Sequence, residues 1–160
     1  KTLFPYTTLF RSACNLVHYE NPLNVVGTVP YLGNRVLLCK RNIEPRKGKW
    51  TLPAGFMELG ESTAEGAARE TTEEAGAQFK MGPLITVMSV PRVGQVHLYY
   101  LAELQSEEFN PGFETQETRM FLESEIPWEE LAFRTVQETL KHYFEDRSAG
   151  QFQVHAFNID

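Results

Sequence analysis

Cysteines and long apolar runs are scarce in this chain. Only Cys14 and Cys39 occur among its 160 residues, too few for a disulfide framework or a complete cysteine zinc site. No apolar run approaches the roughly 18 residues that a membrane-spanning helix needs, and no charged-then-apolar leader opens the chain. We therefore expect a cytoplasmic protein without a membrane partner. Cys39 lies in the apolar run RVLLCK and is expected to be a buried thiol.

Basic stretches are equally rare. The formal net charge is −6 and no basic run exceeds a few residues, so a general nucleic-acid groove is not expected. A phosphate-bearing ligand would instead be met locally, through a metal cation. A hydrophobic content of 42% and an aromatic content of 12% suit one globular domain with an ordinary core.

The first twelve residues, KTLFPYTTLFRS, differ in character from the rest. From Thr2 onward they can be back-translated into a string that resembles a common sequencing adapter. We therefore interpret residues 1–12 as a non-native segment from cloning or assembly and exclude them from fold reasoning. A genuine edge strand at TTLF is the alternative.

Alternation of apolar and polar residues predicts most of the secondary structure. Residues 23–30 and 35–40 read as a hairpin with a Gly-Asn turn, followed by a loop over 42–58. A capping box of Ser62 and Glu65 opens a helix of about 13 residues, which Gly76 ends. Further strands are expected at 79–90, 94–105, 118–122 and 152–159, and helical segments at 127–131 and 134–146. Helices interleaved with strands predict an α/β fold with a mixed sheet.

Three glutamates, Glu70, Glu73 and Glu74, crowd the closing turns of the predicted helix. At 100° per residue they share one side of it. Negative charge near a helix C-terminus costs about 0.3–1 kcal/mol per residue, and a divalent cation would reverse that cost. Carboxylates at this density suit Mg²⁺ or Mn²⁺. They are expected to face away from a small apolar stripe of Ala64, Ala68, Thr71 and Ala75.

A plain salt-bridge ladder is the alternative, because Glu65, Arg69 and Glu73 follow one another at four-residue spacing. Charge pattern alone favours that alternative. The whole stretch GFMELGESTAEGAARETTEEAGA, residues 55–77, decides against it because it resembles the signature of the Nudix hydrolases at every charged and glycine position. Thr71 departs from the signature, which usually has a bulky aliphatic residue there. That position packs inward, so the change bears on stability more than on catalysis.

The resemblance implies a Nudix-type α/β/α sandwich over residues 23–160. Such enzymes use water to cleave a nucleoside diphosphate linked to a further moiety, with one or more divalent ions. The metal ligands it implies are Glu70, Glu73 and Glu74, often joined by the backbone carbonyl of Gly55 or Ala54. Arg69 matches the residue that orients these carboxylates, and Glu61 matches a supporting position.

A general base must also accept a proton, and family members often supply it from a downstream loop. Glu114 and Glu117 in PGFETQETR are the candidates, each with plain loop charge as its alternative. Glu117 is preferred narrowly, because Arg119 is expected on the same strand face and could hold it.

Substrate-binding candidates lie around the box. Arg41 and Arg46 could meet phosphates, and Trp50, Phe56 or Tyr99 could stack on a base. The alternative is a solvated basic loop with core aromatics. His97 is interpreted as a polar residue on a strand face rather than a catalytic base.

A narrower resemblance covers most of the chain, through CNLVHYENP, VLLCKRNIEPRKGKW and EIPWEELAF. It is to a Nudix subfamily that carries a short zinc ribbon and includes ADP-ribose and FAD diphosphatases. Residues 13–22 would be the remnant of that ribbon. Cys14 would be an orphaned ligand, so structural zinc is not expected.

The sequence thus predicts hydrolysis of a nucleoside diphosphate-linked small molecule, ADP-ribose or FAD first. NADH or another dinucleotide is an alternative, although the SQPWPFPxS run of the NADH branch is missing. Two different classes of protein also fit parts of the sequence, a non-catalytic ligand sensor and a nucleic-acid-binding ribbon protein. Intact carboxylates weigh against the sensor, and negative net charge weighs against the ribbon protein. Assembly as a homodimer is left open.

Overall fold

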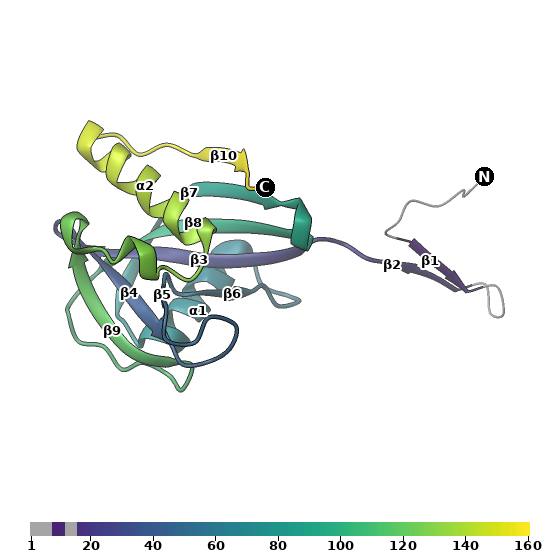
Figure 1. Cartoon of the computed structure of the whole chain (residues 1–160), viewed down its shortest axis with the longest axis horizontal. Coiled ribbons are helices and arrows are strands. Elements are labelled where there is room, and N and C mark those ends of the chain that lie inside the picture. The colour runs from purple at the N-terminus through teal and green to yellow at the C-terminus, as the bar shows by residue number, and fades with distance from the viewer. Residues whose placement is uncertain (1–7, 12–15) are drawn as a thin grey trace.

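The computed structural model describes residues 8–11 and 16–160, and its centre is a mixed sheet of eight strands (Figure 1). Six strands follow the order β10-β7-β8-β3-β4-β5, while β6 pairs with β3 and β9 pairs with β4. β3 runs parallel to β8, and β10 runs parallel to β7. The strands are β3 (Leu23–Leu32), β4 (Arg35–Arg41), β5 (Trp50–Thr51), β6 (Ala54–Phe56), β7 (Phe79–Val90), β8 (Gln95–Leu104), β9 (Thr115–Leu122) and β10 (His155–Asn158).

The predicted hairpin is confirmed as β3 and β4. Leu32 pairs with Arg35 across a two-residue turn, in which Gly33 adopts a φ of 58°. A left-handed conformation at this point costs glycine nothing, and it gives the turn the twist that the strands need.

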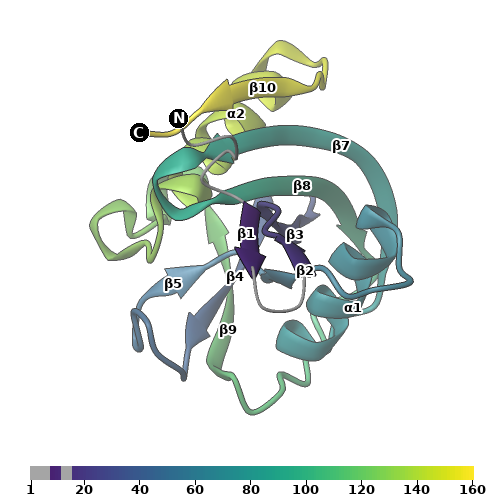
Figure 2. The same cartoon turned by 90° about the vertical axis from the view of Figure 1, so that its right-hand side faces the viewer.

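Two helices cover opposite faces of the sheet, α1 (Thr63–Ala75) and α2 (Arg134–Ala149). The Thr71 hydroxyl of α1 lies 2.7 Å from that of Thr28 in β3. The Thr139 hydroxyl of α2 lies 3.2 Å from that of Thr86 in β7. Through β8, Thr86 is in register with the residue that precedes Thr28 in β3. Because successive side chains of a strand point to opposite faces of the sheet, Thr86 and Thr28 point to opposite faces. Figure 2 shows the helices on different sides of the curved sheet, confirming the α/β/α sandwich.

The main core lies between the sheet and α2. Its fully buried side chains include Val29, Leu38, Ile85, Met88 and Leu140. A smaller cluster lies beneath α1 and contains Leu37, Cys39, Ala75, Ala77 and Leu104. Cys39 is 1% exposed, which confirms the predicted buried thiol. Burial raises the pKa of this thiol.

Several predicted elements differ in detail. The expected loop over 42–58 contains the short strands β5 and β6, which are held by partners in β4 and β3. The segment at 127–131 is a 3₁₀ turn, η3 (Trp128–Glu130), and α2 continues to Ala149 before Gly150 ends it with a φ of 73°. Two further 3₁₀ turns are η1 (Pro91–Val93) and η2 (Glu123–Glu125).

The N-terminal segment forms a separate two-stranded sheet of β1 (Thr8–Arg11) and β2 (Leu16–Tyr19). β1 overlaps the edge strand at TTLF that was the alternative for residues 1–12, and the non-native origin of that segment stays a prediction. Cys14, the expected orphan zinc ligand, lies outside the described residues.

Candidate active site

Helix α1 has the boundaries that its sequence predicts. The Ser62 hydroxyl accepts from the Glu65 amide at 3.3 Å, and the Glu65 carboxylate accepts from the Ser62 amide at 2.8 Å. Gly76 closes the helix with a φ of 59°. The capping box fixes the first residue of the helix and Gly76 fixes its last. The positions of the acidic side chains along the helix axis are fixed as a result.

The loop after β8 is fastened to the C-terminal end of α1. The Gly112 amide donates to the Glu73 carbonyl at 3.0 Å. A Cβ at Gly76 would lie 2.0 Å from the Asn110 carbonyl oxygen, and one at Gly112 would lie 2.4 Å from the Glu73 carbonyl oxygen. Only glycine permits these approaches. Glu114 is thereby placed beside the acidic turns of the helix.

Glu74 lies on the buried side of α1, contrary to the expectation that it faces away from the apolar stripe. Its side chain is 8% exposed, and its Oε2 accepts from the Ala54 amide at 3.1 Å. The buried side of α1 consists of Gly66, Ala67, Thr71, Glu74 and Ala75, so the predicted apolar stripe was wrong at Ala64 and Ala68. Desolvation raises the pKa of Glu74 to about 8.

Glu70 lies against the backbone of β6. A Cβ at Gly55 would lie 2.4 Å from the Glu70 carboxylate, so glycine makes room for that carboxylate. Burial raises the pKa of Glu70, and the negative charges of Glu73 and Glu114 raise it further, while Arg69 opposes the shift. Carboxylates are thus held close together in a partly buried place where their charges are costly.

Arg69 organises the exposed side of this cluster. Its guanidinium donates to both carboxylate oxygens of Glu61, at 3.0 and 2.9 Å. It also contacts Glu70 at 2.7 Å and Glu73 at 3.2 Å, and it donates to the Phe56 carbonyl at 3.1 Å. The hydrogen bonds that Glu61 accepts from Arg69 and from the Glu58 amide lower the pKa of Glu61 to about 2. Arg69 thus holds Glu61, Glu70 and Glu73 through charged hydrogen bonds, and the orienting and supporting roles of Arg69 and Glu61 stay predictions.

The donor chemistry of the cluster suits a hard divalent cation. As the side chains stand, no three His, Cys, Asp or Glu residues of the described part converge on one point. Glu73 is turned toward Arg69 and Glu74 toward the Ala54 amide. The buried carboxylates nevertheless carry charge that their surroundings oppose, so oxygen-rich chemistry and electrostatics fit a cation held by Glu70, Glu73, Glu74 and the Gly55 backbone.

A cavity of about 870 Å³ opens over this cluster. Its lining contains Glu114 as well as the helix glutamates, together with apolar side chains such as Val25 and Ile43. Glu117 is not among its lining residues: it lies on β9 and pairs with Arg119, whose Nε is 3.0 Å from Oε1 of Glu117. The expected pairing is present, but it holds Glu117 away from the cavity. The lining consists of Val25, Arg41, Ile43, Glu44, Pro45, Ala54, Gly55, Phe56, Glu58, Arg69, Glu70, Glu73, Glu74, Gln95, His97, Gly112, Phe113, Glu114 and Phe133.

The substrate-binding predictions divide in the same way. Arg41 and Phe56 line the cavity. Trp50 is 4% exposed and packs edge-on against Phe121 at 5.0 Å between ring centroids, so it cannot stack on a ligand. Tyr99 is 2% exposed and is excluded for the same reason. Arg46 is exposed and does not belong to the lining.

Sequence reasoning missed several lining residues. Phe113 is 80% exposed, and Phe133 stacks beneath the Arg41 guanidinium at 5.2 Å. Gln95 was missed as well, and it shares one face of β8 with His97, the predicted strand-face residue, with Gln95 Oε1 2.9 Å from His97 Nε2. Their i, i+2 spacing predicts that the two side chains lie on the same face of a strand. Only the register of β8 in the sheet shows that this face lines the cavity.

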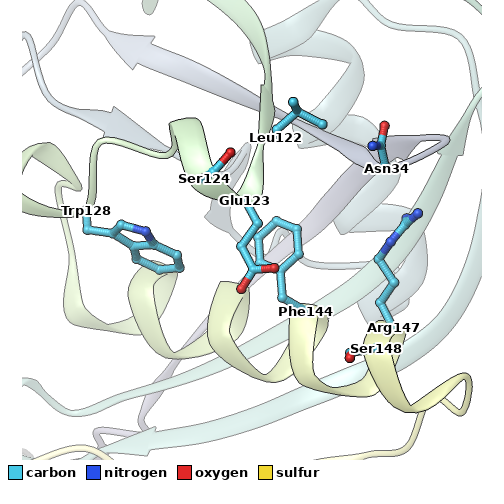
Figure 3. A pocket seen from close by; sticks show the side chains of 8 residues that line it. All are labelled: Asn34, Leu122, Glu123, Ser124, Trp128, Phe144, Arg147 and Ser148. Atoms are coloured by element: carbon cyan, nitrogen blue, oxygen red, sulfur yellow. The ribbon is translucent and has the colours of Figure 1, made fainter.

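A second cavity, of about 610 Å³, lies between α2 and the η2 turn (Figure 3). Leu122, Trp128 and Phe144 are its apolar lining residues, and Glu123 from η2 and Arg147 from α2 also line it. It contains none of the predicted site residues. Of the described helices, none is long and apolar enough to cross a membrane.

Comparisons with known proteins agree with this geometry. The family described as NUDIX domain matches residues 22–148. The crystal structure of a Nudix hydrolase from Nitrosomonas europaea superposes with a TM-score of 0.90 and is 47% identical, over 94% of this chain and 85% of that one.

Two curated relatives match at lower identity. An ADP-ribose pyrophosphatase from Methanocaldococcus jannaschii is 32% identical over 119 residues, which are 72% of this chain and 69% of the relative. An NAD-capped RNA hydrolase NudC from Vibrio parahaemolyticus is 28% identical, and the match spans 44% of its length. The matched region includes the glutamate-bearing helix, its capping residues and the cavity wall, and on this evidence the chain belongs to the Nudix family of hydrolases.

Proposed function

We propose that this enzyme hydrolyses the pyrophosphate linkage of a nucleoside diphosphate derivative, with ADP-ribose or FAD as the substrate, assisted by Mg²⁺ or Mn²⁺. The observation that carries the proposal is one cavity lined by both acidic and apolar side chains. Buried glutamates and Glu114 belong to its lining, and so do Val25, Phe56 and Phe133. A substrate with a charged centre and a flat organic group matches both kinds of side chain.

In the proposed reaction, water adds to one phosphorus and the bridging P–O bond breaks, leaving two phosphate monoesters. A divalent cation bound by Glu70, Glu73, Glu74 and Gly55 would neutralise the pyrophosphate charge and favour attack. Arg69 keeps Glu70 and Glu73 in place through its hydrogen bonds. Arg41, which also lines the cavity, is available to a phosphate oxygen.

Glu114 is the proposed general base, replacing the narrow preference for Glu117. It is a carboxylate on the cavity wall, and its charge acts on Glu70 and Glu74. The attacking water would transfer its proton to this carboxylate. Glu117 faces Arg119 on the sheet and has no route to that proton.

ADP-ribose is the first substrate to test because the Methanocaldococcus jannaschii relative is named an ADP-ribose pyrophosphatase. Purified enzyme is offered ADP-ribose, FAD and NADH with Mg²⁺, with Mn²⁺ and with EDTA, and the products are identified by chromatography. We expect AMP with ribose 5-phosphate, or AMP with FMN, in the presence of metal. Absence of hydrolysis of all three compounds would refute the proposal.

Glu73→Gln and Glu74→Gln test the acidic side chains of the lining. Each keeps the side-chain size but removes a charge, and we expect turnover to fall by at least about two orders of magnitude. Glu130→Gln is the matched control, since Glu130 is exposed and lies outside the cavity. Near-parental turnover in both site variants at saturating Mg²⁺ would show that the assignment is wrong.

A further inference from the structure

Three paired strands contribute neighbouring residues to one part of the cavity lining, which we call its floor. Phe56 of β6 is in register with Val25 of β3, and Val25 is in register with His97 of β8. Side chains at paired positions project from the same face of a sheet. Phe56, Val25 and His97 therefore form a continuous row, and Gln95, two residues before His97, lies beside it on the same face.

His97 is uncharged in this setting. Its Nδ1 is buried without a hydrogen-bond partner in the described part of the chain, and burial lowers the pKa of the ring to about 4. The neutral ring has one proton. On Nε2 that proton is donated to Gln95 Oε1 at 2.9 Å, whereas on Nδ1 it would be a buried donor without an acceptor, which is costly.

This tautomer fixes the orientation of the Gln95 amide. Its oxygen faces His97, so its NH₂ group is left to donate to another acceptor. The floor thus offers a flat apolar surface with a neutral donor at its edge. Phe56 supplies an aromatic face that is 53% exposed, and Phe113, 80% exposed, lines the same cavity.

We propose that Gln95 and His97, with the floor of Val25 and Phe56, bind the nucleobase of the substrate. The proposal rests on the function proposed above and adds the place where the base is recognised. An uncharged heteroaromatic ring with a nitrogen or carbonyl acceptor on its edge fits this surface, because it can stack on Phe56 while it accepts from Gln95. His97 is a positioning residue that holds the amide.

Binding of two small probes tests the proposal without turnover. AMP and ribose 5-phosphate share the sugar phosphate and differ in the base, so calorimetric titration with both isolates the contribution of the base. We expect AMP to bind at least about fivefold more tightly than ribose 5-phosphate, as one neutral hydrogen bond and a stacked ring can supply. Equal affinities, or no binding of either probe at millimolar concentration, would overturn the assignment.

Variants then locate that difference. Gln95→Met keeps the length of the side chain but removes the donor, and it should weaken AMP binding about fivefold while ribose 5-phosphate is unaffected. Phe56→Ala should weaken AMP binding about tenfold through lost stacking. His97→Phe should weaken AMP binding as Gln95→Met does, because the Gln95 amide loses the hydrogen bond that orients it. Gln105→Met is the control, since Gln105 is exposed just beyond the far end of β8.

The outcomes separate this proposal from the reaction itself. If Gln95→Met weakens both probes equally, or neither, the base is not recognised here, even when ADP-ribose is still hydrolysed by the parent. If the parent hydrolyses none of the offered compounds but AMP is preferred and the preference is lost in Gln95→Met, the base site stands and the proposed reaction fails.

Discussion

Replacing Glu74 with glutamine should stabilise the metal-free protein, and the gain should depend on pH. Glu74 is 8% exposed, and burial raises its pKa from 4.5 to about 8. Between these values the folded state keeps a proton that the unfolded state loses, so the free energy of unfolding falls as pH rises from 4.5 to 8. Glutamine carries no titrating proton, and its carbonyl can still accept from the Ala54 amide.

The magnitude follows from the shift. One pKa unit corresponds to about 1.4 kcal/mol, so the full effect at pH 8 is on the order of 2–4 kcal/mol when local relaxation is allowed for. In a domain of this size that is a rise in Tm of about 5–10 °C. His97, whose pKa is lowered to about 4, has the opposite trend below pH 6.5 in both proteins. Its contribution cancels in the difference between variant and parent.

Thermal unfolding in EDTA between pH 5 and pH 8 measures this difference. Glu74→Gln should match the parent near pH 5 and exceed it increasingly toward pH 8. Glu73→Gln is the matched control, because it removes the same charge from a side chain that is 61% exposed. Adding Mg²⁺ or Mn²⁺ should raise the Tm of the parent more than that of Glu74→Gln. A pH-independent difference in Tm would refute the reasoning.

Three further outcomes are expected. Glu114→Gln should lower kcat by about 10²-fold or more with KM little changed, while the kcat of Glu117→Gln should stay within a few-fold of the parent. Equal kcat values for the two variants would refute the choice of base. Thr71→Val should lower the free energy of unfolding by about 1–3 kcal/mol, because the buried Thr28 hydroxyl loses its partner at 2.7 Å, and adding Thr28→Val should recover much of this loss. A denaturation midpoint unchanged by Thr71→Val would contradict this prediction. Metal analysis after dialysis should find no stoichiometric zinc, and about one tightly bound zinc per chain would overturn the account of a truncated ribbon.

The helix was predictable from sequence because its determinants are local. Ser62, Glu65 and Gly76 act within one turn of the helix ends, and the structure has both ends where these residues place them. The hairpin of β3 and β4 was predictable for the same reason. β5 and β6 were missed because strands of two and three residues exist only through their partners in β4 and β3.

The site residues were predictable within the contiguous motif and less predictable outside it. The prediction that Trp50 stacks on a base was wrong, because composition does not distinguish an aromatic residue of the core from one that lines a cavity. The choice between Glu114 and Glu117 depends on where β9 begins, at Thr115, since that start puts Glu117 on the sheet. Glu74 shows a limit of helical periodicity. Periodicity predicts the direction of a side chain around the helix axis, but not whether neighbouring elements bury the side chain in that direction.

Attachment of the β8–β9 loop to α1 also has a consequence for length variation. Gly112 is bound to the Glu73 carbonyl, and the Thr115 amide donates to the Gly112 carbonyl at 3.1 Å. Glu114 therefore takes its position from the helix rather than from the course of the chain before it. Insertions or deletions ahead of Asn110 can lengthen or shorten this loop, and change what surrounds the cavity mouth, without moving Glu114 relative to Glu73.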